Sequence, residues 1–349
     1  MVVTKGANGN GVRMTPAGEK LASPSRVREH DMSVVAPSVV DSESAATASP
    51  QANEGLYLLG RPTLKRFIRH VNYNAVNPPD EGTLVEEWQA AHRALLGLEK
   101  DEAGFADNPR ITKMGPEYEP QLIELLKNPL IRNGFNTVPT EIALVDLEQM
   151  VVYQKHIDIT FASERALQLS ATPSDAEIFR VCLPSETQYP PVRWSGVSSD
   201  KFVFVSPSND LRFLGVMPLE PGHVTGCAHP GSLVGVVGAA VGFGSNFLNA
   251  VYVENRLILR NGSHRAYALF KRGCRRVPCI IQHVRSRDEL ELVGSSELTR
   301  HPDLYLRHPR PPMLKDYFHP ALHKAMSVHR RLHQVTVSFS VEQTELPAL

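Results

Sequence analysis

A short run of polar residues, Asn261-Gly262-Ser263-His264-Arg265, stands between two apolar segments and holds side chains that bind anions. The segment before it, 257–260, is typical of a strand, and 266–270 is typical of the start of a helix. N–H groups at a helix start and the helix dipole attract negative charge. Arg265 can add a two-pronged guanidinium to phosphate oxygens. Gly262 permits close backbone approach. The pattern predicts a phosphate-binding turn.

The same residues also have ordinary structural interpretations. Asn-Gly is a common corner, and Asn261 and Ser263 suit a turn and a helix N-cap as well as they suit ligand contacts. An arginine in a first helical turn is commonly a solvated charge. The phosphate interpretation rests on Gly262, His264 and Arg265 standing in register, with the Val277-Pro278 strand following.

Residues 250–284 resemble the ParB/sulfiredoxin-like superfamily, and residues 138–170 resemble it more loosely. The shared pattern is a strand, a Gly-x-His-Arg turn, a helix and a strand bearing Val-Pro. The resemblance implies a mixed sheet with helices. It also implies phosphate contact by the turn Asn261, Gly262, Ser263, His264 and Arg265, with ATP or CTP and Mg²⁺ as the expected ligands. His264 is the candidate catalytic residue, as the donor of a hydrogen bond or a proton.

A second group of candidates follows the first strand of this domain. In the superfamily that segment helps to enclose the nucleotide, so the resemblance makes Gln154, His156 and Asp158 second-rank site residues. Their period-two spacing equally suits the polar side of a half-exposed strand.

Two differences between this chain and members of the superfamily narrow the range of expected functions. Sulfiredoxins carry a catalytic cysteine where this chain has Ser263, and a hydroxyl does not supply the attacking thiolate, so sulfinic acid reductase activity is not expected. No helix-turn-helix pattern follows the motif, so centromere binding in the manner of ParB is not expected either. The expected function is nucleotide binding, with NTP hydrolysis or phosphate transfer left open. The alternative is a non-catalytic interaction module that uses an inserted hairpin and a basic C-terminal extension.

The composition excludes some protein classes. The chain has 349 residues, and its 37 basic and 37 acidic residues cancel, so it has no general attraction to nucleic acid. Its four cysteines do not form the framework of a small secreted domain, and charged residues interrupt the N-terminus before a signal sequence could form. We therefore expect a cytoplasmic protein. The uncharged stretch 230–253 is long enough to span a bilayer, but its glycines favour a small-residue helix or loop packed on the sheet.

The predicted organisation is an α+β fold with four parts. Residues 1–54 form a disordered tail, 55–135 a helical cap, 136–290 the ParB/sulfiredoxin-like domain and 291–349 a C-terminal extension. Within the domain, 174–221 is an insertion with a hairpin. The expected helices are 63–71, 83–98, 117–126 and 285–297, and the expected strands are 141–147, 150–159, 177–183, 201–205, 211–217, 250–253 and 334–342.

Six histidines between His301 and His333 include two pairs at the i, i+4 spacing that faces one side of a helix. Pro320 follows His319 directly, and no glutamate lies inside either pair, so the metalloprotease pattern is missing. No metal site is predicted.

Overall fold

The computed structural model describes residues 4–5, 12–13, 52–185, 189–220, 222 and 231–347. The chain divides into two compact units. The core unit comprises residues 51–188 and 245–330, and the arm unit comprises residues 1–50, 189–244 and 331–349. Most of the tail predicted for 1–54 lies outside the described residues. In its described part, β1 (Thr4–Lys5) pairs with β2 (Val12–Arg13). The structure is a mixed α+β fold.

The core unit is built on a six-stranded sheet in the order β4-β5-β14-β12-β13-β6. Strands β12 and β14 are parallel, as are β13 and β6, and the remaining pairs are antiparallel. Strands β12 and β14 are buried along most of their length, as expected of strands covered on both faces. The bounds are β4 Ile111–Lys113, β5 Thr140–Asp146, β6 Val151–Val152, β12 Asn249–Val253, β13 Arg256–Asn261 and β14 Arg276–His283.

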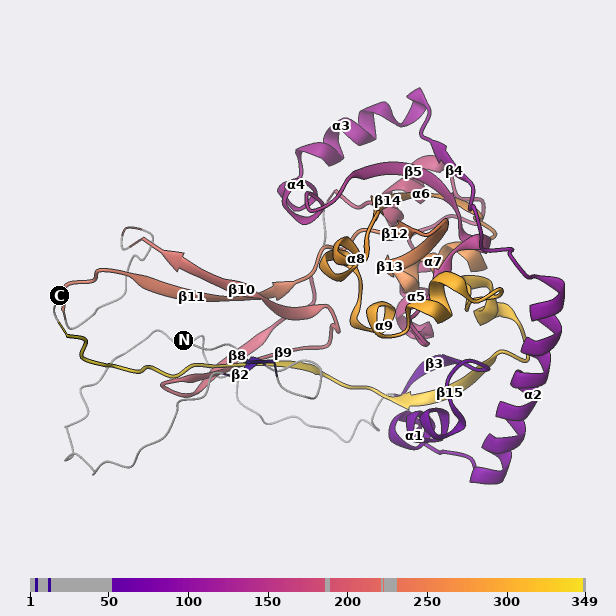
Figure 1. The fold of residues 1–349 in the computed structure, drawn as a ribbon, viewed down its shortest axis with the longest axis horizontal. Coiled ribbons are helices and arrows are strands. Elements are labelled where there is room, and N and C mark those ends of the chain that lie inside the picture. Colours follow the sequence, from indigo (N-terminus) through magenta and orange to yellow (C-terminus); the bar gives the residue numbers. More distant parts are fainter. Residues whose placement is uncertain are drawn as a thin grey trace. The chain divides into compact units, whose positions relative to one another are not determined.

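A second, three-stranded sheet of the core unit has the order β15-β3-β7, with β3 Ala52–Leu58, β7 His156–Asp158 and β15 His323–His329. Helices α1 (Leu64–Asn74) and α2 (Glu81–Asp101) lie beside it (Figure 1). The contact is apolar, because Phe67, Leu84 and Leu95 pack with Tyr57 of β3. Thr63 and Asp80 cap the two helices by accepting hydrogen bonds from the first turns.

Short helices complete the core unit. They are α3 Glu119–Lys127, α4 Pro129–Gly134, α5 Ile159–Ala166, α6 Asp175–Cys182, α7 Ser263–Lys271, α8 Arg287–Val293 and α9 Ser296–Arg300. Single turns of 3-10 helix lie at η1 Pro116–Tyr118, η2 Leu147–Gln149 and η5 Leu314–Phe318, and a π-helical turn lies at η4 Asp303–Arg307.

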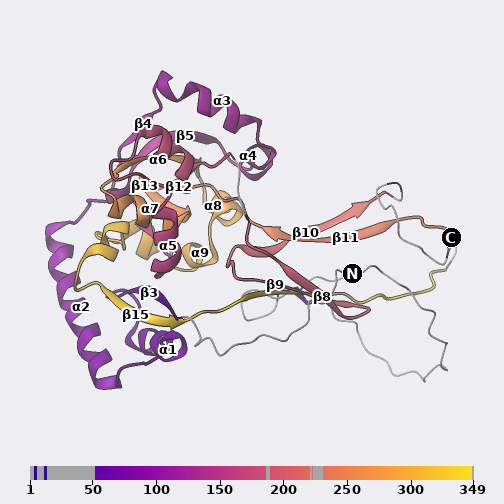
Figure 2. The same ribbon diagram turned by 180° about the vertical axis from the view of Figure 1, so that it is seen from behind.

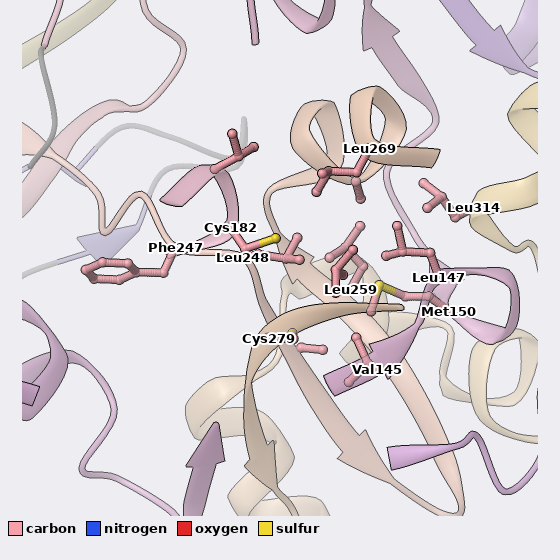
Figure 3. Close-up of a cluster of buried hydrophobic side chains, with 14 of the residues drawn as sticks. Val145, Leu147, Met150, Cys182, Phe247, Leu248, Leu259, Leu269, Cys279 and Leu314 are labelled. Carbon is pink, nitrogen blue, oxygen red and sulfur yellow. The ribbon is translucent and has the colours of Figure 1, made fainter. Parts of the chain in front are cut away.

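The main apolar core lies between α7 and the large sheet. Leu269 of α7 points toward Leu259 of β13, and Val145 and Cys279 come from β5 and β14 (Figure 3). These side chains are almost fully buried. The helix is therefore held by its buried face, and its first turn is placed by the same packing.

The arm unit consists of strands alone in its described part. A three-stranded sheet has the order β16-β9-β8, and β10 pairs with β11 in a separate two-stranded ribbon. The bounds are β8 Arg193–Ser198, β9 Lys201–Ser206, β10 Leu211–Leu219, β11 Val236–Phe243 and β16 His333–Ser338. Ring stacking of Tyr189 on Phe243 and of Phe202 on Phe339 adds apolar contact within this unit.

Several elements of the structure differ from those predicted from the sequence. Residues 177–183, predicted as a strand, form helix α6 up to Cys182 and its C-cap Leu183, because Ser174 and Glu177 form a capping box at the start of the helix. The small-residue stretch predicted as a helix or loop contains strand β11. Strands β9 and β10 do not form the expected hairpin, because β9 pairs with β8 and β16 while β10 pairs with β11.

Two further expectations concern a membrane-spanning segment and a metal site of histidines. Within the described residues, no helix is both long and apolar enough to cross a membrane. His323 lies on β15, so it does not share a helical face with His319 as the spacing suggested. In the same part of the chain, no cluster of three metal-binding side chains is present.

Arg310 is the largest fully buried side chain of the described residues and pairs with two carboxylates. Its guanidinium donates to both carboxylate oxygens of Asp316 and lies 3.0 Å from Glu102, which also pairs with Lys315 at 2.9 Å. A buried charge of this kind is stable only while its partners are present.

Replacing Arg310 by methionine is therefore expected to lower the free energy of unfolding by about 3–5 kcal/mol, because Asp316 would remain as a buried, uncompensated carboxylate. Urea unfolding measures the loss. The exposed Arg300→Met is the matched control and should change stability by less than about 0.5 kcal/mol. Equal effects of the two variants would contradict this role.

Candidate functional site

The predicted strand, turn and helix are present as β13, Gly262 and α7. Gly262 has a φ of 94°, in the left-handed region, and a Cβ atom there would lie 2.7 Å from Leu248 Cδ1 and 3.2 Å from Leu248 Cα. Both the backbone conformation and the space thus require glycine. The pattern's Val-Pro strand is β14.

Asn261 fixes the geometry of the turn. Its side-chain oxygen accepts a hydrogen bond from the N–H of Gly262 at 2.9 Å, and its Nδ2 donates to the carbonyl of Ser245 at 2.6 Å. Asn261 therefore serves as a turn residue, the structural role that its type suggested.

The first turn of α7 leaves donors available. No side chain caps this helix, and the first backbone hydrogen bond that closes it runs from Ala266 N–H to the carbonyl of Gly262 at 2.8 Å. Over the described ranges, no hydrogen bond reaches the backbone N–H of Ser263 or His264. Ser263 is buried and Gly262 is partly exposed. These N–H groups are the donors on which anion binding at a helix start depends.

Arg265 does not lie on the surface. Its side chain is buried, and its Nη1 donates to the backbone carbonyl of Asn246. The guanidinium therefore holds the segment before β12 against α7 from the inside. The positive charge of Arg265 lies behind the turn, and its Nη1 is hydrogen-bonded to the protein backbone.

His264 connects α7 to α5. Its Nε2 accepts a hydrogen bond from the backbone N–H of Asp158 at 3.0 Å, and its ring meets the edge of Phe161 at 5.1 Å. Burial, and then the neighbouring His156, lower the pKa of His264 to about 4. The imidazole is therefore neutral at neutral pH, and because Nε2 is the acceptor, Nδ1 carries the proton.

The second-rank residues lie near His264. Asp158 caps α5 by accepting from Phe161 N–H at 3.0 Å, and its other oxygen accepts from Asn53. His156 precedes it on β7, while the amide of Gln154 donates to the carbonyl of His156. Helices α5 and α7 lie side by side in both views (Figures 1 and 2). The structure thus brings His264, His156 and Asp158 together, and it engages Gln154 within its own loop.

Sequence reasoning did not single out three further neighbours, namely His70, Phe161 and Arg165. His70 of α1 stacks on Tyr57 at 4.0 Å and lies 6.1 Å from the ring of His156. The Arg165 guanidinium lies 4.7 Å above the ring of Phe161 on α5. His70 lies on α1, and Phe161 and Arg165 lie on α5, so their proximity to the turn appears only in three dimensions.

Residues 261–265 do not line the pocket beside Glu141 and His283 or the one beside Leu64 and Glu81. The turn is a partly exposed corner, since Gly262 and His264 are half-buried and Ser263 is buried. No family model, curated protein or solved structure matches the chain. Arguments about function therefore rest on the residues themselves.

Gly262→Ala is expected to destabilise the core unit by about 2–4 kcal/mol, because it adds both backbone strain and a collision with Leu248. Gly273→Ala is the matched control, since Gly273 has a φ of 83° but open space around its Cβ position. It should cost only about 1–2 kcal/mol. Thermal unfolding of both variants measures the difference, and equal losses would exclude the packing constraint.

His264 should make stability depend on pH. Its pKa in the folded chain, about 4, lies below the ordinary value of 6.5, so the unfolded chain binds more protons between these values. Its contribution is complete above about pH 6.5 and is lost as the pH falls toward 4, amounting to about 1–3 kcal/mol after solvent screening.

Unfolding of the wild type and of His264→Gln at pH 7.5 and pH 4.5 tests this. The variant should lose less stability on acidification than the wild type, whereas the exposed His301→Gln should behave as the wild type. A pH dependence unchanged in His264→Gln would show that another group titrates.

Proposed function

We propose that this protein binds a nucleoside triphosphate, ATP or CTP with Mg²⁺, with its phosphates at the first turn of α7, residues 261–265. The observation that carries the proposal is that the N–H groups of Ser263 and His264 have no partner among the described residues. Beside them is Gly262, where a Cβ atom would collide with Leu248. The resemblance of residues 250–284 to the ParB/sulfiredoxin-like superfamily points to the same turn.

The proposed roles follow from the contacts. The N–H groups of Ser263 and His264 hold phosphate oxygens, and the Nδ1–H of the neutral His264 donates one more hydrogen bond. Arg265 supports the turn from within and supplies positive charge behind it. Mg²⁺ would offset the charge of the phosphates.

Binding is better supported than catalysis. His264 is neutral because burial lowers its pKa to about 4, so it holds a hydrogen-bond donor in place but is a weak source of protons at neutral pH. The nearest carboxylate, Asp158, is engaged by Phe161 N–H and Asn53. Hydrolysis or phosphate transfer would need a group outside this set.

The arm unit favours a second candidate, an interaction module. Large apolar side chains are exposed on its strands, namely Trp194, Leu214, Val216, Met217 and Val237. Exposed apolar groups in such number are typical of surfaces that contact another molecule. This candidate does not require the turn to bind a ligand.

A thermal-shift screen of the full chain with ATP, CTP, GTP and UTP, each with Mg²⁺, tests the first proposal. A nucleotide at a hundred times its dissociation constant should stabilise the protein by about 2.7 kcal/mol. Ser263→Asp should abolish this gain, because a carboxylate at the first helical residue occupies the N–H groups and repels phosphate. The Ser263→Asn side chain has nearly the same size as that of Ser263→Asp but carries no charge, so this variant should retain the stabilisation by nucleotide.

Nucleotide stabilisation that persists in Ser263→Asp would place the ligand elsewhere. If no nucleotide stabilises the wild type, the proposal fails and the interaction module is favoured. The double variant Leu214→Lys with Val237→Lys changes the exposed apolar surface of the interaction module. It should leave the stabilisation by nucleotide unchanged.

A further inference from the structure

A pocket with a volume of about 450 Å³ lies at the end of the large sheet opposite the turn. Asn261 pairs with Asn249, at the beginning of β12, whereas Tyr252 near its end pairs with His283 of β14. The carboxyl ends of parallel strands are the usual place for ligands in sheets of this kind. The residues that matter are Pro139, Glu141, Tyr252, His283, Val284 and Arg285.

Glu141 and His283 form an oriented pair within this pocket. The Nε2 of His283 lies 2.8 Å from Glu141 Oε1, and about a third of each side chain is exposed. The backbone holds both strands in place, since His283 N–H donates to the Pro139 carbonyl at 2.8 Å. Because Nε2–H donates to the carboxylate, the neutral ring presents Nδ1 as an acceptor, and a ligand that contacts it must supply an O–H or N–H donor.

Arg285 supplies the charge. Its side chain is exposed, and over the described ranges its guanidinium makes no hydrogen bond or ion pair. Its backbone N–H donates to Glu289 at 2.7 Å, which ties Arg285 to the first turn of α8. The carboxylate of Glu141 is already directed to His283, so Arg285 is available to an incoming anion.

Apolar groups complete the pocket. The ring of Tyr252 lies 5.5 Å from that of His283, and Pro139 and Val284 add aliphatic surface. A ligand that fits this arrangement has an oxyanion at one end and a flat apolar body at the other.

We propose that this pocket is a second ligand site, independent of the turn, for a small organic molecule that carries an oxyanion. Arg285 pairs with two oxygens of the anion, Nδ1 of His283 accepts a hydrogen bond from a protonated oxygen of the ligand, and the ring of Tyr252 contacts the organic body. Glu141 is a positioning residue, because it acts by orienting His283 and does not touch the ligand. Phosphate and carboxylate share the pairing with Arg285, and a protonated phosphate oxygen can in addition donate to His283.

Titration of the full chain with phenyl phosphate, benzoate and inorganic phosphate tests the site, with NMR of the histidine ring protons as the readout. Phenyl phosphate or benzoate should shift the His283 signals in a saturable manner, and the tighter of the two identifies the anion. Inorganic phosphate should bind more weakly, since it lacks the body that Tyr252 contacts.

Arg285→Met should weaken the tighter probe at least tenfold and leave the melting temperature without ligand unchanged, because the side chain has no partner to lose. Arg287→Met removes an equally exposed arginine of the same segment, outside the pocket, and should leave affinity unchanged. Glu141→Gln should alter the His283 signals in the free protein and weaken binding less than Arg285→Met does. Equal binding by the wild type and Arg285→Met, or no saturable shift with any probe, would overturn the proposal.

Discussion

The close approach of Gly262 to Leu248 sets the geometry on which the core unit and its candidate site depend. The chain can pass directly from β13 into α7 only because no Cβ stands between this corner and Leu248. Once α7 starts at Ser263, its Leu269 reaches the core and its His264 reaches the backbone of Asp158. One steric constraint thus determines both the packing of the helix and the position of its partly exposed first turn.

Buried arginines of this protein bind protein groups. Arg265 donates to a backbone carbonyl, Arg256 pairs with Asp107 and the carbonyl of Tyr305, and Arg310 pairs with Asp316 and Glu102. Each joins segments far apart in the sequence. In the candidate turn the donors toward a phosphate are therefore backbone N–H groups and a neutral imidazole, with the nearest guanidinium behind them. Such a site would depend on shape and dipole more than on direct ion pairing.

The elements around the turn could be predicted because their signals are local. Asn-Gly marks the corner, the β-branched runs mark β12 to β14, and the apolar spacing marks α1, α2 and α7. Helix α6 was missed because its apolar residues Ile178, Phe179 and Val181 also suit a buried strand, and only the capping box distinguishes the two. Strand β9 pairs with the adjacent β8 and with β16, and β10 pairs with β11. The distant partner β16 cannot be recognised from a local pattern.

Side-chain roles at the site were harder to predict than its location. Arg265 and a ligand-binding arginine have the same sequence context, and only tertiary packing determines whether the guanidinium faces solvent or a carbonyl. The pair of Glu141 and His283 comes from strands separated by more than a hundred positions, and neither residue lies in a recognisable motif. Charge pairs that form across a sheet are visible only when the strand order is known.

The pairing of β3 with β15 has a consequence for how the protein is made. Residues 52–58 are hydrogen-bonded to residues 323–329, so β3 must wait for a strand that is synthesised long after it. Contacts of such sequence separation slow folding, because a long loop must close before they form. During synthesis the apolar face of β3 and α1 lacks its partner strand, which makes this the stage at which a chaperone would be of most use.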